Sequence, residues 1–296
     1  MSVPRRHHYL PQFFLSGWVN EIGSLFEYSR PYREVVVRER RPSETGYREG
    51  LYSIADRADP VSREEVELRF MQRLDDAAAI AMPELEAILG KPADASLVSD
   101  WACFVMSLVF RSPARIDEMR GEIAKIDSDP RIDLAYQATK LPDDPASYAE
   151  FAAINGDEFS YEEARANLLR RVVASDFSVE RLSSMLWDVV SVRPDGHDLV
   201  LSDNPVVTSN GVLSHDGFLI LPIGPRKFFL ASSSPSVRRY FKQEAMQRRF
   251  AGALNHAIVH NAEELVLAQT RHHRAFVSKR LTAKGQPLRE RVTWQI

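Results

Sequence analysis

The segment from Ser96 to Arg111 reads SLVSDWACFVMSLVFR and is apolar on almost every side when it is projected as a helix. A helix without a polar face is covered by its neighbours rather than by water. Its apolar core from Trp101 to Phe110 is well short of the roughly 20 residues that a membrane span requires. We therefore expect residues 96–111 to form the buried central helix of the fold.

A second helical pattern covers residues 62–81. Ser62 and Glu65 have the spacing of a capping box. The apolar positions that follow fall on one helical face, and they are Val66, Phe70, Leu74, Ala77, Ile80 and Ala81. A projection at about 100° per residue puts Glu67 and Asp76 on the two margins of this face and directs Asp75 away from it.

Strand patterns stand at both ends of the chain. β-Branched and aromatic residues separated by Pro31 predict a hairpin of residues 24–28 and 34–38. Further strands are expected at 51–54, 188–192, 198–202, 218–222, 228–231 and 264–270, with one long helix at 236–256. The sequence thus predicts an α+β fold in a single domain, 1–296. Within this domain we expect a strand-rich region at residues 1–60, a helical region at 61–185, and an α+β region at 186–296 whose strands are mainly antiparallel.

Composition limits the class of protein. The chain has 296 residues, 44% of them hydrophobic, which is enough for a substantial core. Cys103 is the only cysteine, so an intrachain disulfide is excluded. The apolar residues after Arg5 and Arg6 are too few for a signal peptide. We expect a cytoplasmic protein that enters no membrane, and we find no nucleotide or haem motif.

The C-terminal part is locally basic, although the net charge is −3. Between residues 271 and 291 the only acid is Glu290, against Arg271, Arg274, Lys279, Arg280, Lys284, Arg289 and Arg291. Upstream, Glu244 stands among Arg238, Arg239, Lys242, Arg248 and Arg249. Such a surface attracts a phosphate backbone, and we expect nucleic acid as its partner.

The N-terminus contains the densest group of reactive side chains, Arg5-Arg6-His7-His8-Tyr9-Leu10-Pro11-Gln12-Phe13-Phe14-Leu15. Histidine is a common metal ligand and titrates near neutral pH. Neighbours on a strand point to opposite faces, so we expect one imidazole to face a site and the other to orient the segment by a hydrogen bond. A turn would let both converge on a metal.

Other candidate residues lie where predicted elements end. Arg111 is the last residue of the predicted central helix. Its positive charge is favourable at the negative end of the helix dipole, which is one reason for its position. Alternatively, its guanidinium binds a carboxylate or a phosphate bidentately. Asp203 and Asn204 follow a predicted strand. They are either reactive groups at the end of that strand or ordinary turn residues that bond to their own backbone. Gln12, Arg226 and Asn255 complete the set that we expect to bind substrate, with Arg111 and Asn204.

The opening His7-His8-Tyr9-Leu10-Pro11-Gln12-Phe13-Phe14-Leu15 resembles the signature of the uncharacterised bacterial family DUF4238, written His-His-Tyr-Val-Pro-x-Phe-Tyr-Leu. Leu10 and Phe14 replace its usual Val and Tyr. Later blocks are similar too: the acidic helix with Glu67 and Asp76, Phe110-Arg111-Ser112-Pro113, Ser202-Asp203-Asn204-Pro205-Val206, and the helix with Asn255. The resemblance spans nearly the whole chain and implies no assigned activity.

Three hypotheses on function follow. The first is a metal-assisted hydrolase of phosphodiesters, nuclease-like, in which His7, His8, Glu67, Asp76 and Asp203 surround a divalent metal ion that activates water. His7, His8 and Asp203 would be the catalytic residues. The second is a metal-free enzyme with a histidine as general base beside Asp203 and a small anionic substrate held by Arg111. The third is a noncatalytic binding or interaction protein, in which the histidine segment is a buried polar network.

Overall fold

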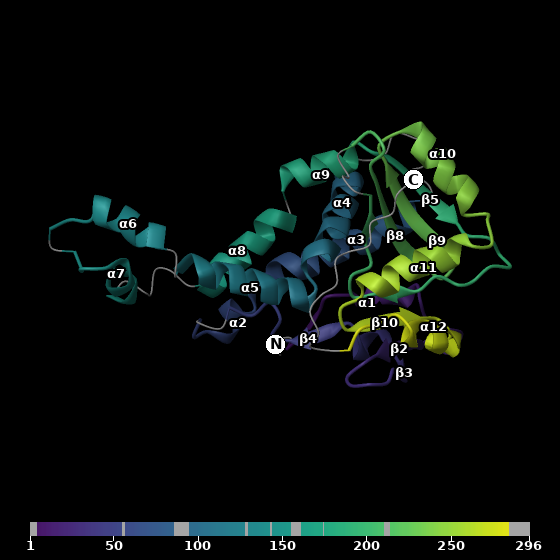
Figure 1. The fold of residues 1–296 in the computed structure, drawn as a ribbon, viewed down its shortest axis with the longest axis horizontal. Coiled ribbons are helices and arrows are strands. Elements are labelled where there is room, and N and C mark those ends of the chain that lie inside the picture. The colour runs from purple at the N-terminus through teal and green to yellow at the C-terminus, as the bar shows by residue number, and fades with distance from the viewer. Residues whose placement is uncertain are drawn as a thin grey trace.

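The protein is an α+β structure in which a helical layer packs against antiparallel sheets (Figure 1). The computed structural model describes residues 5–54, 57–85, 95–127, 130–142, 144–154, 161–173, 175–209 and 214–283. The apolar side chains form one continuous core that includes Trp18, Trp101 and Phe229. The predicted fold class is confirmed.

The central helix is α4, Ala95–Phe110, as the sequence predicts. Trp101, Phe104 and Leu108 on it are buried, and it packs on α3, α8 and α9. The other helices of the middle region are α2 (Pro60–Arg63), the π-helical turn η2 (Glu67–Met71), α3 (Gln72–Glu84), α5 (Pro113–Asp127), α6 (Pro130–Thr139), α7 (Tyr148–Ile154), α8 (Tyr161–Val173) and α9 (Asp176–Ser183). Figure 1 shows α6 and α7 projecting from the body.

The predicted start of the 62–81 helix is wrong. Asp59 is the N-cap of α2, and its carboxylate accepts a hydrogen bond from the Ser62 N–H at 2.7 Å. Ser62 therefore lies inside α2 rather than at a cap. The helical path then passes through the π-turn η2 into α3, which changes the direction in which later side chains point.

Two four-stranded antiparallel sheets carry most of the strands. One has the order β3-β2-β10-β6 and the other β5-β9-β8-β7. The strands are β2 (Leu25–Ser29), β3 (Val36–Arg40), β5 (Leu186–Ser191), β6 (Leu201–Ser202), β7 (Val207–Thr208), β8 (Phe218–Gly224), β9 (Lys227–Ser232) and β10 (Leu265–Ala268). The predicted hairpin is present as β2 and β3. Because β10 pairs with both β2 and β6, the two ends of the sequence share a sheet.

Two further sequence expectations are corrected. The predicted helix over 236–256 is two helices, α10 (Pro235–Glu244) and α11 (Phe250–Asn261). Residues 51–54 are not a strand, because their backbone groups bond elsewhere: the Tyr52 N–H donates to His7 and the Ile54 N–H to the Arg63 carbonyl. The short elements η3 (Arg271–His273) and α12 (Arg274–Ser278) follow β10.

The N-terminal segment is held by a two-stranded sheet of β1 (Arg6–His8) and β4 (Tyr47–Glu49). Behind it, the Gly46 carbonyl accepts hydrogen bonds from the N–H groups of Tyr9 and Leu10. Gly46 has a φ of +67°, and a Cβ there would lie 2.9 Å from the Leu10 Cβ, so only glycine fits. This contact fixes the start of α1 (Gln12–Ser16), which packs near the turn η1 (Pro42–Glu44).

No single helix in the described ranges is long and apolar enough to cross a membrane. The helices α4 and α5 meet that test only as a pair, bent by 71° at the break between them.

Candidate functional site

His7 and His8 lie on opposite faces of β1. The register of β1 with β4 pairs His7 with Arg48 and His8 with Tyr47. Side chains alternate along a strand, and His7 is fully buried whereas His8 is half-buried and lines a pocket. The segment thus presents one imidazole to a cavity and the other to the core.

His7 is bonded on both sides by the protein. Its Nδ1 accepts a hydrogen bond from the Tyr52 N–H at 3.0 Å, and its Nε2 lies 2.9 Å from the Glu64 carboxylate. An Nδ1 that accepts leaves the proton on Nε2, which then donates to Glu64. The ring stacks on Tyr52 at a centroid distance of 5.6 Å. His7 therefore orients the segment and is not open to a ligand.

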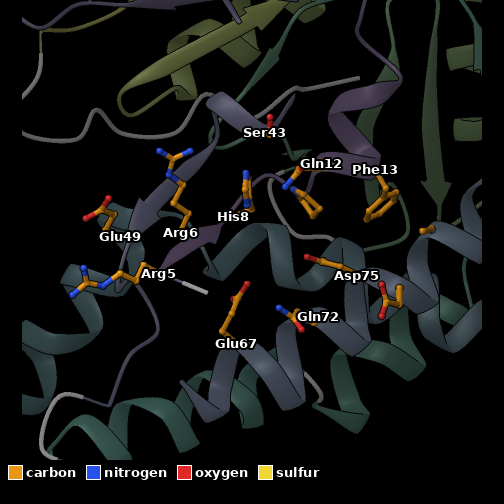
Figure 2. A pocket seen from close by; sticks show the side chains of 13 residues that line it. Arg5, Arg6, His8, Gln12, Phe13, Ser43, Glu49, Glu67, Gln72 and Asp75 are labelled. Carbon is orange, nitrogen blue, oxygen red and sulfur yellow. The ribbon is translucent and has the colours of Figure 1, made fainter. Parts of the chain in front are cut away.

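The pocket beside His8 has a volume of about 810 Å³, within the range of small-molecule sites. It is built from β1, α1, η1, β4, η2 and α3 (Figure 2). The residues that line it are Arg5, Arg6, His8, Pro11, Gln12, Phe13, Ser43, Glu49, Glu67, Gln72, Asp75, Asp76 and Ala79. Most of these side chains are polar or charged, and Pro11, Phe13 and Ala79 are apolar.

The sequence-based direction of Asp75 is wrong, since Asp75 lines this pocket with Glu67. In a regular helix these two residues would lie about 80° apart around the axis. The π-turn over Glu67–Met71 accommodates one extra residue, which removes about 100° and brings the two side chains to within about 20° of each other. π-Turns are frequent at functional sites, and this one places both carboxyl groups on one face.

Arg111 lies beneath the pocket and is fully buried. Its Nη1 donates to Asp75 at 2.7 Å, and its Nε donates to the Tyr9 carbonyl at 2.9 Å. Its Nη2 is buried and has no hydrogen-bond partner among the described residues. Burial raises the pKa of Asp75, and the Arg111 cation and the hydrogen bond that it donates oppose that shift. The contact with Arg111 holds the Asp75 side chain in place.

Glu67 is held in its neutral form. Its side chain is buried, and Oε2 has no hydrogen-bond partner within the described part of the chain. Loss of hydration raises the pKa of Glu67 to about 8, with Asp75 adding to the shift and Arg111 opposing it. At neutral pH this side chain is therefore a carboxylic acid that has a proton to give.

His8 is neutral as well, for the same reason of burial. Its Nε2 is buried and has no partner among the residues that the structure describes. Burial and, to a smaller extent, the cations Arg111 and Arg6 together lower the pKa of His8 to about 4. The imidazole therefore has a free lone pair at neutral pH, which makes it able to accept a proton.

The outer part of the pocket carries exposed charges. Arg5 and Arg6 are exposed, and neither forms an ion pair within the described ranges. The Arg6 guanidinium lies 4.8 Å from the centre of the Tyr47 ring, a cation–π distance. In Figure 2 both arginines lie on the β1 side, and Asp75 lies on the α3 side beyond Glu67 and Gln72.

Asp203 lies outside the pocket lining. Its carboxylate accepts hydrogen bonds from three backbone N–H groups, those of Glu263, Glu264 and Leu265, at 2.8, 2.6 and 3.0 Å. Burial is the main cause that raises the pKa of Asp203, and the nearby Glu263 carboxylate raises it as well. The three N–H donors oppose this shift. The contacts join the end of β6 to the start of β10.

The other expected substrate-binding residues also lie away from the pocket. The Asn204 amide donates to the Asn261 carbonyl. Asn255 accepts from the Val200 N–H and donates to the Asp198 carbonyl. Arg226 pairs with Asp198 at 2.8 Å. These contacts connect loops and helices of the C-terminal part.

The structure thus gathers part of the predicted set. His8, Gln12, Glu67 and Asp76 line one pocket, and Arg111 reaches it through Asp75. Among the described residues, no three His, Cys, Asp or Glu side chains are placed to hold a metal ion, and the divalent ion stays a prediction.

Sequence reasoning missed Arg5, Arg6, Gln72 and Asp75 as pocket residues. For Arg6 a signal existed, because Arg6 and His8 alternate on one strand face.

The predicted nucleic-acid surface remains a prediction too. Arg238 and Lys242 both contact the buried Asp188 at 2.9 Å, so part of its positive charge is neutralised. Arg248 and Arg249 are strongly exposed, with side chains 81% and 82% accessible. Lys284, Arg289 and Arg291 lie outside the described residues.

Comparison with known proteins gives one match. The family model described as "Protein of unknown function (DUF4238)" matches residues 6–272, which include the histidine segment and every pocket residue except Arg5. No curated protein matches the chain, and no solved structure does.

Proposed function

Because the chain belongs to the DUF4238 family of proteins of unknown function, we propose its activity from the pocket itself: a metal-independent hydrolase that acts on a small polar substrate by general acid–base catalysis. One observation carries this proposal. The pocket is lined by a base and an acid, His8 and Glu67, whose pKa values are displaced in opposite directions to about 4 and about 8. Such displaced pairs are typical of acid–base sites.

The two neutral side chains have complementary roles. His8 takes a proton from a water molecule as the water oxygen attacks the acyl carbon of the substrate. Glu67 gives its proton to the leaving oxygen or nitrogen as that bond breaks. The His8 imidazolium then loses its proton to solvent, and Glu67 regains one, which restores the starting state.

Neighbouring side chains support these roles. Gln12 and Gln72 line the pocket, and their amide N–H groups are suitable donors to an oxyanion that develops on the substrate. The Asp75–Arg111 ion pair places a balanced charge pair beside the acid. Arg111 pairs with Asp75 and Glu67 is neutral, so the protein itself compensates the charge in the inner part of the pocket. Asp203 takes no part, because its carboxylate is engaged by three backbone N–H groups.

The test is a hydrolysis assay at pH 6.5 on p-nitrophenyl acetate, amino-acid p-nitroanilides and bis(p-nitrophenyl) phosphate, in EDTA and in Mg²⁺ or Mn²⁺. We expect hydrolysis of an ester or anilide in EDTA. His8→Gln and Glu67→Gln should each lower kcat by about 100-fold or more. Glu122→Gln, an exposed carboxylate on α5, is the matched control and should retain full activity.

The other two hypotheses correspond to other outcomes of this assay. Phosphodiester hydrolysis that needs a divalent ion would replace the proposal by the metal-assisted reaction. No turnover of any substrate, or turnover that is insensitive to both pocket variants, would leave a binding function.

A further inference from the structure

The pocket is electrically polarised along its length. Its strand end contains Arg5 and Arg6 against the single carboxylate of Glu49. Its helix end contains Asp75 and Asp76, of which Asp75 is paired with Arg111. The strand end therefore has an excess of positive charge, and the helix end has an excess of negative charge. Figure 2 shows Arg5 and Arg6 on one side and Asp75 on the other, with His8, Glu67 and Gln72 between.

The excess charges are available to a ligand. Arg5 and Arg6 form no ion pair within the described residues, and Asp76 likewise has neither an ion pair nor a hydrogen bond from its side chain there. All three side chains are exposed and line the pocket. The cation–π contact with Tyr47 holds the Arg6 guanidinium near β4 without neutralising its charge.

The spacing of the charges sets the length of a matching ligand. Asp76 follows Glu67 by nine residues, which is about 13 Å along a helix axis. In Figure 2 the arginines lie on the far side of Glu67 from Asp75, the residue that precedes Asp76. A peptide backbone spans about 3.5 Å per residue, so about four residues cover the rise from Glu67 to Asp76, and a ligand that also reaches Arg5 and Arg6 is at least that long.

We infer that the substrate is a small zwitterion whose anionic group binds Arg5 and Arg6 and whose ammonium group binds Asp76. The bond to be cleaved then lies between the two ends, beside His8 and Glu67. Short peptides and amino-acid conjugates have this chemistry. An aminoalkyl phosphate has the same pair of charges but no acyl carbon, so it serves as a probe of binding alone. The inference rests on the proposed function for the cleavage step, but the binding of a zwitterion does not depend on turnover.

The test compares four peptides by isothermal titration calorimetry at pH 7: tetraglycine, its N-acetyl form, its C-terminal amide, and the form blocked at both ends. Each block removes one charge and leaves the backbone unchanged. We expect the zwitterion to bind at least threefold more tightly than either singly blocked peptide, since each exposed ion pair contributes modestly. As a second zwitterion, 6-aminohexyl phosphate tests whether the anion is a phosphate rather than a carboxylate.

Two variants assign the ends. The double variant Arg5→Gln/Arg6→Gln should abolish the preference for a free carboxylate and keep that for a free amine. Asp76→Asn should do the reverse. Arg239→Gln and Asp216→Asn are matched controls at exposed positions outside the pocket lining and should change neither preference.

Equal affinities for all four peptides would overturn the inference. So would binding that depends on one charge alone, or the absence of binding by either zwitterion. A failure of the proposed function looks different, because charge-dependent binding would then persist without any product.

Discussion

His7 and His8 show how two adjacent, chemically identical side chains acquire opposite roles. The alternation of a strand sends one to the core and the other to the pocket. His7 has a hydrogen bond on each ring nitrogen, whereas the Nε2 of His8 has no partner among the described residues. His7 thus has a structural role, and His8 is the histidine that is available to a substrate.

His7→Ala should lower the free energy of unfolding by about 2–4 kcal/mol, because it leaves the buried Tyr52 N–H without its acceptor and removes one of the donors to Glu64. His8→Ala should change it by less than about 1 kcal/mol. Urea denaturation of both variants at pH 7 measures the difference. Equal losses of stability would contradict the separate roles of the two residues.

Because of Glu67, the free energy of unfolding should decrease as pH rises. Its pKa in the folded protein, about 8, is above the ordinary value of 4.5, so the folded state holds a proton that the unfolded state has released between those values. The folded state is therefore favoured more strongly at pH 5 than at pH 8, and this part of the stability is lost as pH rises towards 8.

Glu67→Gln removes that proton linkage while it keeps a neutral side chain of similar shape. We expect the stability of the variant relative to the natural protein to rise by about 2 kcal/mol or more as pH increases from 5 to 8, although the variant loses activity. Denaturant unfolding at several pH values measures this. A difference in stability that stays constant with pH would show that Glu67 is not neutral in the fold.

At the scale of the element, the π-turn η2 explains why a regular helical projection misplaced Asp75. If the turn holds one extra residue, its removal restores a regular helix without moving either flank. Deleting the exposed Arg69 should therefore cost less than about 2 kcal/mol and should keep the raised pKa of Glu67. Denaturant unfolding and carbon-detected NMR titration of the carboxyl groups measure both effects.

The matched control is deletion of Ile80, which is exposed in the regular part of α3. That deletion rotates all following side chains by about 100° and should unfold or severely destabilise the protein. If the two deletions are equally damaging, the extra residue is not what the π-turn accommodates.

Local patterns predicted the elements that depend on local physics. The all-apolar run at 96–111 and the β-branched run around Val35 became α4 and the β2–β3 hairpin. Residues 51–54 failed as a strand because their N–H groups bond to His7 and Arg63, which are distant or irregular partners. The sequence predicted that His8 and Glu67 belong to a site. The direction of the Asp75 side chain was not predictable, because it depends on a π-turn that the periodicity of apolar residues does not reveal.

At the scale of the whole molecule, the first and last parts of the chain stabilise each other. β10 pairs with β2 from the N-terminal part and with β6 from the C-terminal part. Asp203 fastens β6 to the start of β10 through three backbone N–H groups. An acid that sequence reasoning placed at a reactive centre thus has contacts typical of a structural residue.

Asp203→Ala should lower the free energy of unfolding by about 3 kcal/mol or more, because it leaves three backbone donors without an acceptor. The folded fraction should keep its kcat. Thermal unfolding and active-site-normalised kinetics measure the two effects, and Asp203→Asn serves if the alanine variant does not fold. A loss of kcat at unchanged stability would return Asp203 to the catalytic set.

The most direct measurement of the acid–base account is the pH dependence of kcat/KM from pH 3 to pH 10. With neutral His8 as base and protonated Glu67 as acid, activity should rise with pH near 4 and fall near 8, in a bell-shaped profile. In Glu67→Gln, the residual activity should lack the alkaline limb. A profile that is flat across pH 8, or an alkaline limb that survives in Glu67→Gln, would contradict the account.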